Sequence, residues 1–344
     1  MYMKYIVKIV AVLLLTLLPF VDKIVPHSKE TGTIIEISEA YEMPIPHKIA
    51  KINNGEQVIE ATLYLTSTSY EVGENVMIQK DPQQPDLYSV SDKTRTKPLI
   101  QLFILFIAII LIVSGEAGVR SLMGLGFSFL VIFKIVLPQI VMGSNPITVA
   151  LMASAIILMV SYYLTHGINQ KSTIAILGTL GALIVTGILA SIFATASHLS
   201  GFGAEETAFL LDKLPVSSFY NLLLAGFIIG SLGVLDDITI SQASIVAELS
   251  EANKKLGMYE LYIRAMRIGH DHISSLVNTL VLVYAGSALP LLLIFITSDV
   301  STVSLLNYEA VAEEIVRTLV GSIGLVTAVP LTTLIASYHF GTKR

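Results

Sequence analysis

Two adjacent carboxylates, Asp236 and Asp237, lie within an otherwise apolar stretch that covers residues 218–249. An ionisable group in hydrocarbon costs several kcal/mol, so it usually faces a partner, a cavity or an ion pathway. A carboxylate in such a place can take up and release a proton. The alternative is that both groups lie at a wet, interfacial end of a helix. The spacing of the neighbouring polar residues favours the first interpretation for one of the two.

Small and polar residues recur every three or four positions through this stretch, which places them on one face of a helix. They are Gly226, Gly230, Gly233, Asp237, Ser241, Ser244 and Glu248. The glycines favour close helix packing, whereas the hydroxyls and carboxylates could hold or relay a proton. Asp236 points about 100° away from this face. We therefore expect Asp237 to be the proton carrier and Asp236 to be an interfacial residue without a special role.

The next apolar segment begins with a similar stripe of polar residues, also spaced three or four apart: Arg267, Asp271, Ser275 and Asn278. We expect the two stripes to face each other, since the connection between them is short. Asp271, Asn278, Ser241, Ser244 and Glu248 would then tune or relay the proton of Asp237. Asn278 lies inside the apolar run, where its amide needs a hydrogen-bonding partner.

The last apolar segment carries Arg317, Gly321, Gly324 and Ala328 on one face, and we expect the glycines to pack closely against other helices. Arg317 lies too far along its helix to pair with Asp237. It can snorkel to the membrane interface or pair with Glu313 or Glu314.

Metal and enzyme chemistry are not expected. His270, Asp271 and His272 have the right ligand types for a divalent cation, but adjacent helical residues diverge by about 100° and cannot point together. The chain has no cysteine, which excludes thiol catalysis and thiolate metal sites. It also has no HExxH or nucleophile motif, so an intramembrane hydrolase is the least favoured class. We expect no cofactor and no metal.

The composition is that of a polytopic helical membrane protein, whose first partner is the lipid bilayer. The 344 residues are 53% hydrophobic and 14% charged, whereas soluble chains carry about 25% charged residues. The net charge of -5 gives no indication of nucleic-acid binding. Three regions are predicted: a membrane anchor at 1–21, a small domain at 22–98 and a membrane domain at 99–344. Retention of the anchor is favoured over its cleavage, because no small-residue cleavage site follows it.

We expect eight membrane spans, the anchor and seven more. The seven cover residues 99–117, 120–138, 146–165, 173–196, 218–243, 273–297 and 310–338. Lys and Arg concentrate in alternate short loops, which places both termini and the predicted loop 246–270 in the cytosol. The small domain is then extracytoplasmic, and the protein belongs to the cell membrane.

The small domain reads as β structure. Strand-like runs cover 31–38, 47–52, 57–65 and 75–79, and Ile59, Ala61, Leu63 and Leu65 alternate with polar neighbours. Asn53–Gly55 is a hairpin turn signal. We expect an OB-like barrel, which could be a passive spacer or a binding module.

Three long motifs resemble the YibE/F family of bacterial membrane proteins, whose members are described as permeases. The first contains Gly233, Asp237 and Ser241, with Asp236 at the position where the family usually has Met. The second contains Gly269 and Asp271, with His270 where the family has Arg. The third is Asn278–Leu280. The resemblance covers the chain from about residue 86 onward.

The order of these segments is more faintly similar to half of a SecD/SecF or RND-type transporter, in which an Asp at this position carries protons or other monovalent cations. This resemblance implies a cation-coupled transporter or export factor of unknown substrate, working as a homodimer. The alternative is a non-transporting membrane scaffold whose β domain binds a cell-envelope partner.

Overall fold

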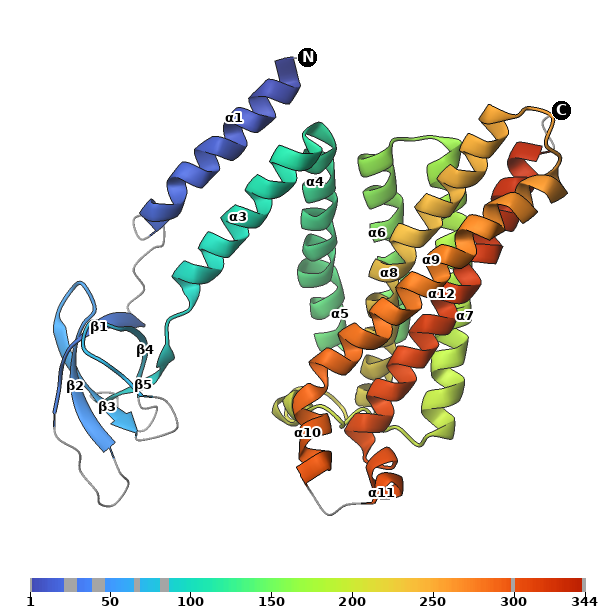
Figure 1. Cartoon of the computed structure of the whole chain (residues 1–344). Coiled ribbons are helices and arrows are strands. Elements are labelled where there is room, and N and C mark those ends of the chain that lie inside the picture. The colour runs from blue at the N-terminus through green and yellow to red at the C-terminus, as the bar shows by residue number, and fades with distance from the viewer. Residues whose placement is uncertain are drawn as a thin grey trace. The chain divides into compact units, whose positions relative to one another are not determined.

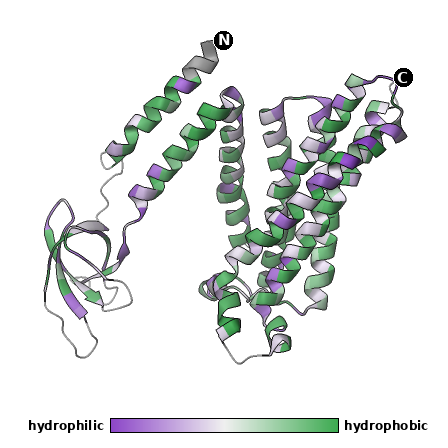
Figure 2. Cartoon of the chain, viewed as in Figure 1, coloured by the Kyte–Doolittle hydropathy of each residue, from purple (hydrophilic) through white to green (hydrophobic). Residues whose placement is uncertain are grey.

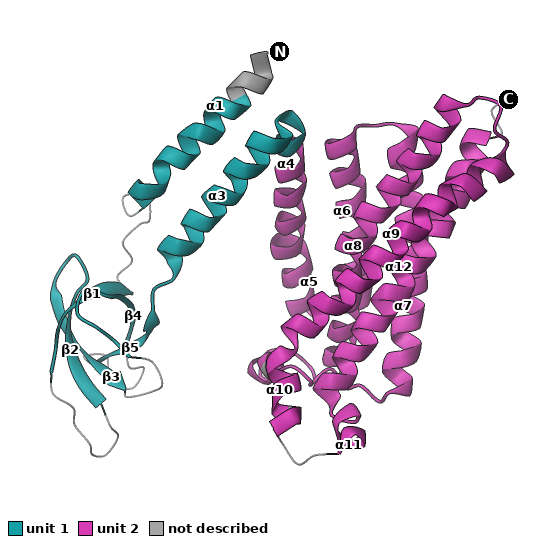
Figure 3. Ribbon diagram, viewed as in Figure 1, with its two compact units in different colours: residues 1–119 teal, residues 120–344 magenta. Residues whose placement is uncertain are grey.

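The computed structural model describes residues 2–21, 30–38, 47–64, 69–80, 87–297 and 301–341. Leu65, expected in the third strand, lies outside these residues. The chain divides into two compact units, Met1–Val119 and Arg120–Arg344 (Figure 3).

Unit 1 contains a closed five-stranded barrel, an architecture that OB-folds share. Its strands are β1 (Thr31–Ile37), β2 (His47–Asn53), β3 (Val58–Tyr64), β4 (Asn75–Lys80) and β5 (Tyr88–Lys93), in the order β1-β2-β3-β5-β4. β2 and β3 form an antiparallel hairpin, and Gly55 takes a φ of 88° in its turn. β5 pairs parallel to β3 and antiparallel to β4, which closes the barrel.

The period-two pattern correctly predicts the barrel core. Ile59, Ala61 and Leu63 of β3 are all at least 93% buried, together with inward residues of the other four strands. Four of the strands agree with the expected runs. β5 was not expected, because Val90 is its only buried hydrophobic residue and the alternation around it is weak.

Among the described residues, unit 1 also has the helices α1 (Tyr2–Leu17), followed by a 3-10 turn η1 (Leu18–Phe20), and α3 (Thr96–Ser114). They pack together, with Ala11 and Ala108 fully buried. The side-chain amide of Gln101 donates a hydrogen bond of 3.1 Å to the Leu18 carbonyl. Because of this packing, α3 belongs to the same compact unit as the anchor and the barrel.

The remaining helices follow in chain order. They are α4 (Glu116–Val131), a π-helical turn η2 (Ile132–Val136), α5 (Leu137–Val141), α6 (Pro146–His166), α7 (Gln170–Ala196), a 3-10 turn η3 (Glu205–Leu210), α8 (Ser217–Ala252), α9 (Met258–Ser287), α10 (Leu289–Thr297), α11 (Thr302–Leu306) and α12 (Glu309–Gly341). α12 packs against α7, α8 and α9, and α8 packs against α6 and α7 (Figure 1).

Six helical segments of the described chain are long and apolar enough to cross a membrane: Thr96–Ser114, Glu116–Val141, Pro146–His166, Gln170–Ala196, Ser218–Ala252 and Glu309–Gly341. The first apolar run is shorter, Val7–Phe20. The segment 273–297, expected as one span, is instead the second half of α9 followed by the separate α10. The chain breaks at Ala288, just before Pro290, whose ring and missing N–H disfavour continuation of the helix. Hydrophilic residues also interrupt α9 in Figure 2.

The segment 246–270, expected as a loop, is almost entirely helical. α8 continues to Ala252 and α9 starts at Met258, which leaves residues 253–257 as the connection. The charges that end the apolar stretch do not end the helix, because Glu, Lys and Arg are good helix formers.

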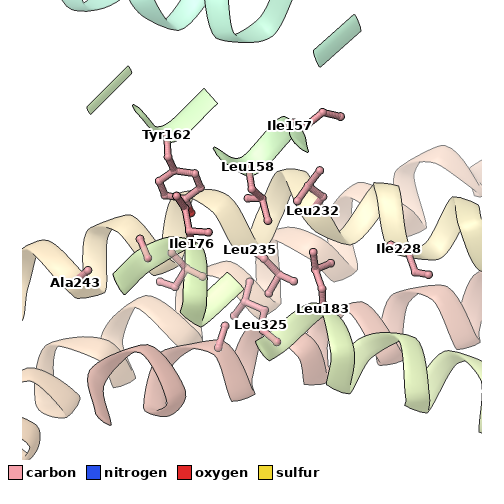
Figure 4. Packing of buried hydrophobic residues seen from close by; sticks show 14 of the residues in the cluster. Ile157, Leu158, Tyr162, Ile176, Leu183, Ile228, Leu232, Leu235, Ala243 and Leu325 are labelled. Carbon is pink, nitrogen blue, oxygen red and sulfur yellow. The ribbon is translucent and has the colours of Figure 1, made fainter. Parts of the chain in front are cut away.

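The core of unit 2 lies between α6, α7, α8 and α12. Figure 4 shows Tyr162 of α6 pointing toward α7 and α8, beside Leu158 and Leu235, and all three side chains are at least 98% buried. Glycines let α12 approach α7 closely: a Cβ on Gly178 would overlap Thr332, and a Cβ on Gly324 would overlap Thr186.

Candidate functional site

The predicted stripe on α8 faces away from the core of unit 2. Gly226, Gly230, Gly233, Asp237 and Glu248 are exposed, whereas Ser241 and Ser244 are half-buried. A Cβ built on any of the three glycines would meet no atom within 4 Å among the described residues. These glycines therefore do not pack against another part of the described chain.

A small pocket of about 230 Å³ lies between α8 and α9 at the polar end of this stripe. Asp237 and Ser241 line it from α8, and His272 and Ser275 line it from α9, with Ile238 and Leu276 beside them. The structure thus brings part of the two polar stripes together. The Nδ1 atom of His272 is buried and has no hydrogen-bonding partner among the described residues.

The residue of α9 that accompanies Asp237 differs from the expectation. Asp271 and Asn278 are exposed and do not line the pocket, whereas His272 does. At about 100° per residue, the face that carries His272, Ser275 and Leu276 is centred roughly 90° away from Asp271. The described residues contain no group of three or more His, Cys, Asp and Glu side chains placed to hold a metal ion.

Asp236 lies nearer the core than its neighbour and is half-buried. Its backbone carbonyl accepts a hydrogen bond of 2.9 Å from the Tyr162 hydroxyl of α6. The same hydroxyl lies 2.7 Å from Thr239 Oγ1 and 3.1 Å from Thr179 Oγ1, and those two threonine oxygens are 2.6 Å apart. We expected Asp236 to be an interfacial residue without a special role, and these polar neighbours were not foreseen, because Tyr162 and Thr179 come from other helices and helical phase on α8 says nothing about them.

A second pocket, of about 630 Å³, opens beside the α6–α7 turn. Its lining comes from that turn, α8 and the end of α12: His166, Asn169, Gln170, Lys171, Ser172, Ile240, Ser244, Glu251 and Phe340. Lys171 Nζ lies 2.8 Å from a carboxylate oxygen of Glu248. No local signal in the sequence shows that these three distant segments surround one cavity.

The buried face of α8 carries a polar residue that sequence reasoning missed. Gln242 is fully buried, and its Nε2 donates to the Ala265 carbonyl at 3.1 Å and to Thr333 Oγ1 at 2.7 Å. Its Oε1 has no hydrogen-bonding partner among the described residues. A Cβ on Gly269 would lie 3.2 Å from this amide, so glycine at that position leaves room for it.

Carboxylates at the start of α12 accept hydrogen bonds from the segment between α7 and α8. One oxygen of Glu309 accepts from the backbone N–H and the hydroxyl of Ser200 and from the N–H of Gly201. Glu313 is 95% buried and accepts from Gly203 N at 3.1 Å.

Arg317 pairs with Glu314 at 2.6 Å, which confirms one of the predicted partners, and its guanidinium lies 5.2 Å from the ring centre of Phe227. Gly324 lies against Thr186, as described above, whereas a Cβ on Gly321 would make only an ordinary 3.8 Å contact with Ser231.

Comparison with known proteins gives a family and little else. No curated protein and no solved structure matches the chain, so the resemblance to SecD/SecF and RND-type transporters remains a hypothesis. The family model for YibE/F-like proteins matches residues 102–342, which include both pockets, α8, α9 and α12. The chain therefore belongs to the YibE/F-like protein family.

Proposed function

We propose that this protein is a membrane transporter or export factor coupled to a proton or another monovalent cation, with Asp237 as the carrier. The observation that supports this most directly is the pocket of about 230 Å³, in which Asp237 faces His272, Ser241 and Ser275. A carboxylate and an imidazole in one small cavity are both able to bind and release a proton.

Each lining group has a distinct part in this proposal. Asp237 carries the proton. The buried Nδ1 of His272, which has no hydrogen-bonding partner in the described part of the chain, can exchange it. Ser241 and Ser275 supply hydroxyls that can hold a water molecule between the two. In the predicted orientation the pocket of about 630 Å³ opens to the cytosol, and its residue His166 lies within electrostatic range of Asp237. That pocket would supply water to the carrier.

The test is proton flux in liposomes that contain the purified full chain. Asp237→Asn keeps the size of the side chain and removes its ability to release a proton, so flux should fall to the level of empty liposomes. His272→Gln should reduce flux without abolishing it. Asp212→Asn is a matched control, because Asp212 is exposed in a loop outside both pockets. Wild-type flux in Asp237→Asn would disprove the carrier role.

The membrane scaffold is the second candidate function, and the closed barrel is the observation that favours it. The barrel has its own buried core, so it can present a stable surface to a cell-envelope partner. This function requires residues 22–98 and tolerates Asp237→Asn. A strain whose phenotype depends on the protein distinguishes the two: loss of phenotype on deletion of 22–98, with normal phenotype in Asp237→Asn, supports the scaffold.

A further inference from the structure

The proposed function leaves the carboxylate of Asp236 on α8 unused. It is half-buried, whereas Asp237 is exposed. The Tyr162 hydroxyl donates to the backbone carbonyl of Asp236 at 2.9 Å and also acts on the Asp236 carboxylate. Tyr162, Thr179 and Thr239 are each at least 99% buried, so this carboxylate lies against a dry group of hydroxyls.

The oxygen atoms around these three hydroxyls could accept more hydrogen bonds than the three hydroxyl hydrogens can donate. They make three contacts with one another and four with the backbone carbonyls of Ala175, Leu235 and Asp236, all between 2.6 and 3.2 Å. Only three hydrogens are present to serve seven contacts. Each hydroxyl can therefore turn its hydrogen to a different oxygen while the heavy atoms stay in place. Such a group can serve a neighbour in two protonation states.

We propose that Asp236 is a second protonation site of the membrane region, and that Tyr162, Thr179 and Thr239 form the adjustable hydroxyl group that serves both of its states. When the carboxylate is ionised, Tyr162 donates its hydrogen to it. When a proton from water binds the carboxylate, the new O–H donates to the Tyr162 oxygen. The Tyr162 hydrogen then turns to Thr239 or to the Asp236 carbonyl. The site deepens the proposed function, on which its use in coupling rests.

The surroundings of Asp236 leave the hydroxyls as its closest polar partners. The titratable groups that act on it directly are Tyr162 from α6 and Asp237 from α8. His272 of α9 lines a pocket with the neighbouring Asp237, and His166 of α6 interacts with Asp237 only electrostatically. α7 contributes the uncharged Thr179 at this level, and its Lys171 is paired with Glu248. α12 faces this part of α8 with the hydroxyl of Thr333, which Gln242 binds.

A route for the proton exists at one end of this group. The ring centres of Tyr162 and His166 are 6.1 Å apart on successive turns of α6, and His166 lines the pocket of about 630 Å³. Water in that pocket can reach the α6 turn that carries His166, one helical turn from the hydroxyl group.

Infrared difference spectroscopy of the full chain in lipid nanodiscs tests the site without any transport assay, since protonated carboxyl groups absorb apart from the amide bands. A pH titration of the wild type should show a carboxylic-acid band that Asp236→Asn removes and Asp237→Asn retains. Tyr162→Phe should keep the band and change its protonation constant by about tenfold, one pH unit. Thr239→Ser, which keeps a hydroxyl, should titrate like the wild type.

Each outcome decides the proposal. A titration of Asp236→Asn identical to that of the wild type would show that Asp236 does not exchange protons. A wild-type titration in Tyr162→Phe would show that the hydroxyls do not serve the carboxylate. Thr179→Val provides the same test if Tyr162→Phe does not fold. An Asp236 band together with wild-type flux in Asp237→Asn would remove the proposed carrier and leave this site standing.

Discussion

The two faces of α8 carry polar and small residues for opposite reasons. On one face, Thr239 and Gln242 are buried, and their side chains bond to α6, α7, α9 and α12. On the other, Gly226, Gly230 and Asp237 are exposed, and no described residue approaches the glycines. A polar side chain on the first face is part of the fold, whereas one on the second is free to act on something else.

The glycines show the same difference. Gly178 and Gly324 are required by the approach of α7 and α12, because a Cβ at either position would overlap a threonine. The α8 glycines allow a close approach that no other part of the described chain makes. Similar sequence patterns therefore have different uses in these two places.

The largest effect should come from a charge on the buried face. Gln242→Glu keeps the size of the side chain, removes the two hydrogen bonds that its amide donates and buries a carboxylate in their place. We expect a loss of about 3–5 kcal/mol in the free energy of unfolding. Thermal unfolding in detergent measures it. Asp237→Asn, an isosteric change on the open face, should alter stability by less than about 0.5 kcal/mol. Equal losses in the free energy of unfolding in both variants would show that the two faces of α8 do not differ in this way.

Adding one methyl group should separate the two kinds of glycine. Gly178→Ala places a Cβ on Thr332 and should cost about 1–3 kcal/mol through overpacking. Gly230→Ala meets no neighbour and should stabilise α8 by about 0.5–1 kcal/mol, because alanine restricts the unfolded chain. Chemical denaturation of the two variants measures the change in the free energy of unfolding, which should be negative for Gly178→Ala and positive for Gly230→Ala. A destabilising Gly230→Ala accompanied by a change in oligomeric state would show that a second chain covers the open face.

The ion pair between Lys171 and Glu248 should contribute less. Glu248 is 68% exposed and Lys171 is 32% exposed, so we expect a coupling of about 0.2–1 kcal/mol that high salt reduces. A double-mutant cycle with Lys171→Met and Glu248→Gln isolates it. Coupling that stays constant in high salt would mean that this end of the open face is drier than the structure shows.

The smallest effect is expected for the ion pairs of the barrel. The hydrogen bond from Lys93 lowers the pKa of Glu74 below its ordinary 4.5, and the hydrogen bond from Arg95 lowers the pKa of Asp92 below its ordinary 3.8. Both carboxylates therefore stabilise the barrel at neutral pH, and this contribution is lost as the pH falls below about 4.5 through their lowered pKa values.

Hydrogen exchange of the β2–β3 hairpin in the full chain, corrected for the intrinsic pH dependence, measures that loss. Glu74→Gln should flatten the profile, while the exposed Glu56→Gln should leave it unchanged. A profile that does not respond to Glu74→Gln would mean that this ion pair adds nothing to stability.

Local periodicity predicted the elements and half of the site. The period of two identified four strands, and the period of 3.6 brought Asp237 and Ser241 to one face opposite Ser275. It could not identify His272 as the partner, because a shift of one residue on α9 exchanges Asp271 for His272. The boundaries of α8 and α9 were missed because hydropathy changes where the apolar stretch ends, whereas the helix continues through charged residues.

The remaining parts of the site depend on contacts between distant segments. Tyr162 lies 77 residues from Thr239, and Lys171 lies 77 residues from Glu248. Neither pair has a motif, and each depends on how α6, α7 and α8 pack. Gln242 gave no signal because a single polar residue in an apolar helix has the same sequence appearance whether it is buried or exposed.

The position of α12 has a consequence for how the protein is made. It is the last helix of the described chain, yet it packs against α7, α8 and α9 and supplies Glu309 and Glu313 to backbone donors more than 100 residues earlier. During synthesis α7, α8 and α9 leave the ribosome before α12, so at first they lack the helix that packs against all three. Nascent chains that stop before residue 309 leave the glycines of α7 and the N–H groups of Ser200 and Gly203 without their partners. Such fragments should be substrates for membrane quality control. Insertion of α12 should be the step that protects the newly synthesised protein from degradation.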